Sequence, residues 1–126
     1  MAVRSLFPIL LTRDLPRLVA FYEHALHAVV DYRFGSPDED DYVSLRIGGA
    51  SLGVGRTPDA PPTGDRVALW FYVDDVDATY AAWMDAGGRG DQAPADMPWG
   101  ERVAQVRDPG GTLVNLGMEA PAAASS

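Results

Sequence analysis

The stretch Asp14-Leu15-Pro16-Arg17-Leu18-Val19-Ala20-Phe21-Tyr22 opens with an aspartate followed by a leucine and a proline. An aspartate here predicts a helix N-cap, and proline is common in the first helical turn. A second stretch, Asp75-Val76-Asp77-Ala78-Thr79-Tyr80-Ala81-Ala82-Trp83, repeats the capping aspartate and places Trp83 where the first places Tyr22. The two stretches therefore indicate an internal repeat of one supersecondary unit.

The first half has one apolar run before its helix and three shorter runs after it. Residues 5–12 predict a mostly buried strand, because the run is short, apolar and followed by turn residues. The buried face of the helix is marked by Leu15, Leu18, Val19, Tyr22 and Leu26. Further strands are expected at residues 28–34, 42–47 and 50–55. Residues 35–41 are expected to form an acidic loop, and Gly48-Gly49 a hairpin turn.

The second half follows the same order. A strand at residues 67–73 leads into a helix that ends at Gly87-Gly88. The apolar stripe of this helix consists of Val76, Tyr80, Trp83 and Met84. Three strands follow, near residues 89–92, 101–106 and 112–118, with the turn Asp108-Pro109-Gly110-Gly111 before the last. The sequence therefore predicts an α+β fold made of two βαβββ modules.

The segment between the halves is rich in proline and polar residues and is the one clear linker, at residues 58–65. It separates a first module, residues 1–57, from a second module, residues 66–119. Residues 120–126 predict a disordered tail. Each module alone has too little core, so we expect the two to form one structural domain.

Composition narrows the classes of function. The chain has 126 residues, 47% of them hydrophobic, no cysteine and a formal net charge of -8. Without cysteine there is no disulfide, thiolate metal site or cysteine nucleophile. The negative charge disfavours nucleic acid and would attract a cationic small molecule, although acidity also simply keeps a protein soluble. No signal-like or membrane-spanning run is present, so we expect a cytoplasmic protein without a membrane partner.

Two βαβββ units with a capping aspartate after the first strand resemble the vicinal-oxygen-chelate superfamily, which includes glyoxalase I, extradiol dioxygenases, fosfomycin-resistance enzymes and bleomycin-binding proteins. The resemblance runs from Phe7 to Met118. Three stretches resemble bleomycin-resistance proteins more narrowly. They are Asp40-Asp41-Tyr42, Leu69-Trp70-Phe71-Tyr72-Val73 with Tyr80-Ala81-Ala82-Trp83 after it, and Met97-Pro98-Trp99-Gly100-Glu101-Arg102.

The resemblance implies curled mixed sheets around a groove, in a homodimer with exchanged strands or arms. Enzymes of the superfamily hold one divalent metal at four positions, which in this chain are Phe7, Gly53, Ala68 and Asn115. Three of these side chains have no donor atom, and a lone amide is a poor ligand. We therefore expect no metal, no cofactor and no catalysis.

Two other patterns suggest chemistry at first sight. His24 and His27 could share a helix face, but no third metal ligand is in register, so a solvated face is the preferred interpretation. The glycines within residues 48–55 do not lead into a helix. They favour a hairpin and a strand that faces a ligand over a phosphate-binding loop.

Alternation along the strands predicts which side chains face the groove. The groove face is expected to contain Phe7, Tyr42, Ser44, Arg46, Gly53, Trp70, Tyr72 and Asn115. An aromatic, partly polar surface with small residues suits a planar ligand. Trp70 and Tyr72 could equally be core residues, and Trp83 is expected in the core. Trp99 lies in a Pro-Trp-Gly segment, where contact with a ligand or partner is expected instead.

We expect a non-catalytic binding protein that confers resistance by sequestering a planar aromatic or cationic antibiotic, bleomycin-like or enediyne-like. By resemblance, its rings would stack between Trp99 of one subunit and Tyr42 of the other, and Asp40 and Asp41 would attract positive charge. Two alternatives stay open. One is an enzyme of glyoxalase or dioxygenase type, dependent on metal or using Glu101 or a tyrosine as acid or base. The other is an interaction module with no small ligand.

Overall fold

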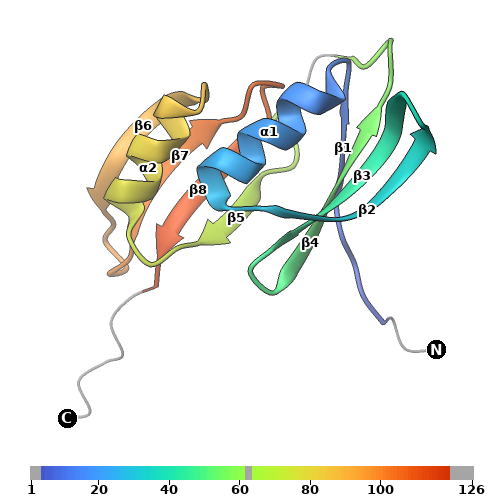
Figure 1. Ribbon diagram of the computed structural model, residues 1–126. Coiled ribbons are helices and arrows are strands. Elements are labelled where there is room, and N and C mark those ends of the chain that lie inside the picture. Colours follow the sequence, from blue (N-terminus) through green and yellow to red (C-terminus); the bar gives the residue numbers. More distant parts are fainter. Residues whose placement is uncertain (1–3, 62–63, 120–126) are drawn as a thin grey trace. The chain divides into compact units, whose positions relative to one another are not determined.

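A computed structural model describes residues 4–61 and 64–119 of the chain. The chain divides into two compact units, Met1–Pro61 and Pro62–Ser126 (Figure 1). The boundary between the units falls inside the expected linker. The expected tail, residues 120–126, lies outside the described residues.

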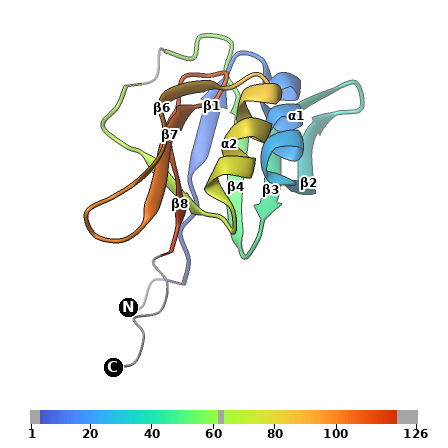
Figure 2. The same ribbon diagram turned by 90° about the vertical axis from the view of Figure 1, so that its left-hand side faces the viewer.

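The first unit is a helix packed on a four-stranded mixed sheet. Its elements are β1 (Ile9–Thr12), α1 (Leu15–Leu26), β2 (Val29–Ser36), β3 (Glu39–Ile47) and β4 (Ala50–Arg56). The strand order is β1-β4-β3-β2, with β1 parallel to β4 and the other pairs antiparallel. The helix α1 contacts β3 and β4 and covers one face of the sheet (Figure 2).

The second unit repeats this arrangement. Its elements are β5 (Leu69–Tyr72), α2 (Val76–Asp85), β6 (Arg89–Asp96), β7 (Arg102–Arg107) and β8 (Leu113–Met118). The strand order is β5-β8-β7-β6, with β5 parallel to β8. Contacts join α2 to β6, β7 and β8 (Figure 1). The predicted α+β fold with two βαβββ units is therefore confirmed.

Equivalent residues cap the two helices and fill the two cores. The Asp14 carboxylate accepts the Arg17 backbone N–H at 3.2 Å, and the Asp75 carboxylate accepts the Ala78 N–H at 3.0 Å, as expected of N-caps. Tyr22 and Trp83 are both fully buried. The repeat that the sequence predicted thus extends from the cap to the centre of each core.

The first strand differs from the expectation of a mostly buried strand. It begins at Ile9 rather than residue 5, and Ile9 and Leu11 are 50% and 58% exposed. Alternate side chains of a strand point to opposite faces, and these two lie on the face that α1 does not cover. In α2, Met84 does not belong to the buried stripe that the sequence predicted, because its side chain is 42% exposed. Trp83 faces the sheet, and the next residue of a helix points about 100° away from it.

The expectation of an acidic loop at residues 35–41 was wrong. The strand β2 continues to Ser36 and β3 already starts at Glu39, so only Pro37 and Asp38 lie between them. Arginines on the sheet explain how acidic residues are accommodated in a strand. The Asp40 carboxylate pairs with Arg33, and Glu39 and Asp41 pair with Arg56.

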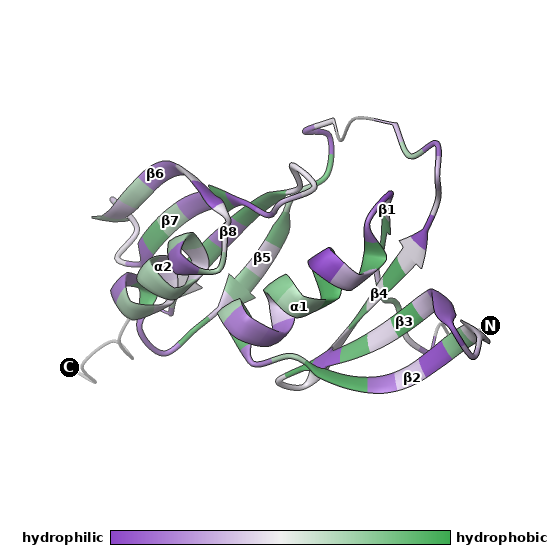
Figure 3. Cartoon of the chain, turned by 45° about the horizontal axis from the view of Figure 1, so that its top comes forward, coloured by the Kyte–Doolittle hydropathy of each residue, from purple (hydrophilic) through white to green (hydrophobic). Residues whose placement is uncertain are grey.

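Figure 3 shows hydrophobic and hydrophilic positions mixed along the helices and strands of both units. This mixture is typical of elements that bury one face only. In the part of the chain that the structure describes, neither helix combines the length and the apolar character needed to cross a membrane.

Candidate ligand-binding site

The sheet of the second unit has an open face opposite α2, and Trp70 and Tyr72 of β5 lie on it. Trp70 pairs with Asn115 and Tyr72 with Gly117 across β5 and β8, so these four positions share one face. The Trp70 indole lies over Gly117, since a Cβ atom built on that glycine would stand 2.9 Å from the ring. The glycine therefore provides the space in which the indole lies against the sheet.

Two aromatic side chains at this site share one carboxylate, and a third lies against one of the two. The Trp70 and Tyr72 rings are 5.8 Å apart between centroids, at an interplanar angle of 59°. The Tyr72 hydroxyl donates to Glu101 Oε2 at 2.8 Å, and Trp99 Nε1 donates to Glu101 Oε1 at 2.6 Å. We call Trp70, Tyr72, Trp99 and Glu101 the aromatic–carboxylate cluster.

A tight turn presents Trp99 at the start of β7. The Gly100 N–H donates to the Met97 carbonyl at 2.9 Å, and the Met97 N–H donates to the Glu101 carbonyl at 2.7 Å. Proline at the second position and Gly100 at φ 100° suit such a turn. The hydrogen bond to Glu101 then fixes an indole that is 60% exposed. Trp99 is therefore held on the surface and is not part of the core.

The exposed fractions of the cluster also bear on whether Trp70 and Tyr72 are core residues. Trp70 is 43% exposed and Tyr72 54% exposed, whereas Trp83 on the other side of the sheet is fully buried. Trp83 Nε1 donates to the Arg107 carbonyl at 2.8 Å, which satisfies its one polar atom. The prediction that Trp83 belongs to the core is confirmed, while Trp70 and Tyr72 stay accessible within their unit.

The hydrogen bond from Tyr72 to Glu101 raises the pKa of the Tyr72 phenol. Partial burial and the negative charges of Glu101 and Glu119 act in the same direction. The phenol therefore keeps its proton around neutral pH and remains a hydrogen-bond donor to Glu101.

The first unit also has an open face, which carries the remaining predicted residues. Tyr42 pairs with Gly55 and Ser44 with Gly53, so all four share the face of Ile9. The Tyr42 hydroxyl lies over Gly53, where a Cβ atom would come within 2.6 Å of it. Tyr42 and Ser44 are half-buried, and Arg46 is exposed further along the same strand.

Two further aromatic residues of β2 join this face and were not predicted. Tyr32 pairs with Ser44, and Phe34 pairs with Tyr42. The Tyr32 and Tyr42 rings are 6.2 Å apart, and Tyr32 and Phe34 are 55% and 61% exposed. An irregularity between Val30 and Tyr32 shifts the strand by one residue, so simple alternation from Val30 would place Tyr32 and Phe34 on the other face.

The side chains that correspond to the superfamily's metal positions do not fit a divalent metal. Phe7, Gly53 and Ala68 offer no side-chain donor. The Asn115 Oδ1 atom accepts a long hydrogen bond of 3.4 Å from Gln105. A divalent ion requires several convergent donors. Among the described residues, no three His, Cys, Asp or Glu side chains form a group that could hold a metal ion.

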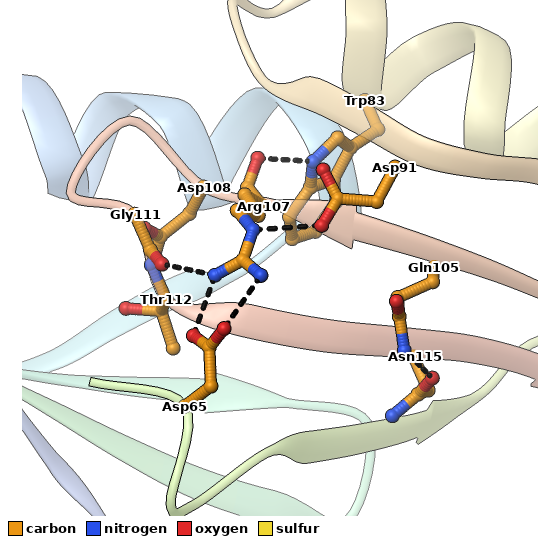
Figure 4. A network of polar contacts seen from close by, with 9 residues as sticks. All are labelled: Asp65, Trp83, Asp91, Gln105, Arg107, Asp108, Gly111, Thr112 and Asn115. Carbon is orange, nitrogen blue, oxygen red and sulfur yellow. Dashed lines mark hydrogen bonds and ion pairs between the residues drawn. The ribbon is translucent and has the colours of Figure 1, made fainter. Parts of the chain in front are cut away.

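A polar network stabilises the β7–β8 end of the second unit (Figure 4). The Arg107 guanidinium donates to both carboxylate oxygens of Asp65 at 2.7 and 2.9 Å and to Asp91 at 2.8 Å. It also donates to the Gly111 carbonyl at 3.2 Å. The bonds from Arg107 to Asp65 lower the pKa of the Asp65 carboxyl group. The network attaches the segment before β5 to the sheet and so supports the start of the strand that carries Trp70 and Tyr72.

Glu101 is the residue of this site that sequence reasoning underestimated. From the sequence, Glu101 is a candidate acid or base only, whereas the structure bonds it to Tyr72 and Trp99. Glu101 precedes β7 and shares the alternation of Val103 and Gln105, which point to the open face. This alternation is the sequence signal that could have placed Glu101 on the same face as Trp70 and Tyr72.

Two βαβββ units, each with a helix on one face and aromatic residues on the other, define a glyoxalase-like class of protein. Residues 5–116 match the model of the Glyoxalase/Bleomycin resistance protein/Dioxygenase superfamily. The chain belongs to this superfamily, and the resemblance seen in its motifs is confirmed.

Known relatives and solved structures agree with this membership. A mycobacterial protein named "Putative glyoxylase CFP32", from Mycobacterium tuberculosis and Mycobacterium bovis, is 34% identical over 115 residues. The match covers 88% of this chain but 42% of the relative, so the chain spans less than half of that protein's length.

Two solved structures share the fold. A bleomycin resistance determinant encoded on transposon Tn5 has a TM-score of 0.71 at 23% identity, covering 93% of this chain and 98% of its own. A bleomycin-binding protein complexed with bleomycin has a TM-score of 0.69 at 24% identity, covering 93% and 99%.

Proposed function

We propose that this protein is a non-catalytic small-molecule binder that confers resistance by sequestering a planar aromatic antibiotic, cationic and bleomycin-like or enediyne-like. The observation that carries the proposal is the aromatic–carboxylate cluster. Three large aromatic side chains remain 43–60% exposed there, and hydrogen bonds to one carboxylate hold two of them. Exposed aromatic residues that are fixed in place provide stacking surfaces with little ordering cost on binding.

The magnitude of stacking is sufficient for useful affinity. Each aromatic pair contributes on the order of 1 kcal/mol beyond the burial of its surface. Contacts with Trp99 and Trp70, together with burial of a drug-sized ligand, support micromolar or tighter binding. Solved proteins of this fold that resist or bind bleomycin support the choice of ligand class.

We further propose that the binder is a cytoplasmic homodimer. The open face of the first unit supports association, because it exposes Ile9, Leu11, Tyr32 and Phe34 by half or more. Contiguous apolar surface of this kind commonly marks an interface. Sedimentation velocity checks this part of the proposal: a dimer is expected at micromolar concentration, and a monomer throughout the range would contradict it.

The mycobacterial relative's name favours one other candidate, a metal-dependent enzyme of glyoxalase type. The side chains at Phe7, Gly53 and Ala68 argue against it. Elemental analysis of the purified protein distinguishes the two, because stoichiometric iron, manganese, nickel or zinc would favour the enzyme.

The proposed function is tested by titrating tryptophan fluorescence with bleomycin, an enediyne and other planar antibiotics. We expect saturable quenching by at least one compound, which mass spectrometry then recovers chemically unchanged. Failure of every compound to quench would contradict binding, and conversion of the bound compound would contradict a non-catalytic role.

A further inference from the structure

Glu101 makes no ion pair within the described residues, whereas several other acidic side chains of the two units do. Asp40 pairs with Arg33, Asp65 with Arg107, and Asp77 and Asp96 with Arg102. Within the described residues, the polar contacts of Glu101 are to two neutral donors, the Tyr72 hydroxyl and the Trp99 indole. Its negative charge is therefore left uncompensated beside aromatic rings.

The carboxylate also keeps unused acceptor capacity. An ionised carboxylate offers about four lone-pair sites, of which the two neighbours occupy one on each oxygen. Glu101 is half-buried, so screening by water is weaker there than at a fully exposed side chain. A positive group placed beside it would gain an ion pair and contact with aromatic faces together.

We infer that the aromatic–carboxylate cluster is a subsite for an organic cation, with Glu101 as the residue that selects for positive charge. The ligand group that fits is a flat, weakly hydrated cation such as an N-alkylated heteroaromatic ring, since such a ring both stacks on indole and pairs with a carboxylate. A small hard metal ion does not fit, because it needs several oxygen ligands and gains nothing from indole. This inference rests on the proposed function, of which it specifies the ligand class.

Two probes of nearly equal size and shape isolate the effect of charge. N-methylquinolinium is a permanent cation, and quinoline is uncharged in slightly alkaline buffer. Indole N–H signals in proton–nitrogen NMR spectra report binding to the full chain. Trp70 and Trp99 belong to the subsite, whereas Trp83 is buried and hydrogen-bonded to the Arg107 carbonyl and serves as an internal reference.

In the parent protein, N-methylquinolinium should shift the Trp70 and Trp99 signals with an affinity about tenfold higher than that of quinoline, the size expected for a partly exposed cation–aromatic and ion-pair site. Glu101→Gln keeps the shape and an acceptor but removes the charge, so the two affinities should come within about twofold of each other. Glu23→Gln is the matched control, because it removes one exposed carboxylate from α1 and should leave the tenfold preference.

The outcomes separate this inference from the proposed function. Equal affinity for the two probes in the parent, or a preference that survives in Glu101→Gln, overturns the cation subsite while planar binding stands. Absence of any shift at Trp70 and Trp99 with either probe overturns both. An unchanged Trp83 signal and melting temperature in Glu101→Gln verify that the variant is folded.

Discussion

At the scale of single residues, Trp83 and Trp99 separate stability from binding. Trp83→Ala should lower the free energy of unfolding by about 3–5 kcal/mol, because it opens a cavity in the second core and leaves the Arg107 carbonyl without its donor. Trp99→Ala should change it by less than about 1 kcal/mol, because the indole is 60% exposed. Urea unfolding curves of both variants provide the measurement, and comparable losses would contradict the assignment of Trp99 to the surface.

Tyr72 provides a second prediction at this scale. Glu101→Gln removes the charged acceptor that raises the pKa of the Tyr72 phenol, so that pKa should fall towards the ordinary tyrosine value. Carbon NMR of labelled tyrosine rings follows the titration, with Tyr22 as a buried reference. A Tyr72 titration that is identical in the parent and the variant would show that the hydrogen bond does not persist in solution.

Residue positions could be predicted where regular alternation holds. The predicted faces of Trp70, Tyr72 and Asn115 agree with the register of β5 and β8, because neither strand contains an irregularity. The exposed positions of Tyr32 and Phe34 could not be predicted, since the irregularity in β2 changes which residues share a face.

At the scale of elements, the ion pairs of Arg107 predict how the second unit responds to acid. The pKa of Asp65 is lower in the folded state than in the unfolded chain, so the folded state binds fewer protons there. The resulting stabilisation is present above the unfolded pKa of about 3.9 and is lost as the pH falls through the folded pKa.

The melting temperature of the parent should therefore drop below about pH 4, and Arg107→Met should show a shallower drop from a lower starting value. High salt should reduce the difference, because Asp65 is exposed. A pH profile of the variant that is parallel to that of the parent would contradict the role of this network.

Element order was predictable because caps and apolar runs are local signals, as Asp14 and Asp75 demonstrate. The ends of the helices and strands were less predictable than their order. Residues 39–41 were expected in a loop because of their charge, and cross-strand arginines keep them in β3. Such pairing depends on contacts between distant residues, which a local pattern does not contain.

At the scale of the whole molecule, superfamily membership was predictable from several motifs together, and the ligand was not. Capping aspartates and the Asp-Pro-Gly turn specify a scaffold that serves many functions. The chemistry of the site depends on a few side chains that converge from β5 and from the turn before β7, such as Tyr72, Trp99 and Glu101.

The central claim, that exposed aromatic residues of the second unit bind a planar ligand, is tested most directly by isothermal titration calorimetry with bleomycin, an enediyne and the other planar antibiotics of the fluorescence titration. The titration compares the parent with Trp99→Ala. We expect saturable binding to the parent and an affinity lower by roughly ten- to a hundredfold in the variant, as for the loss of an aromatic anchor. Equal affinity of the two proteins, or no heat of binding to the parent, would contradict the account.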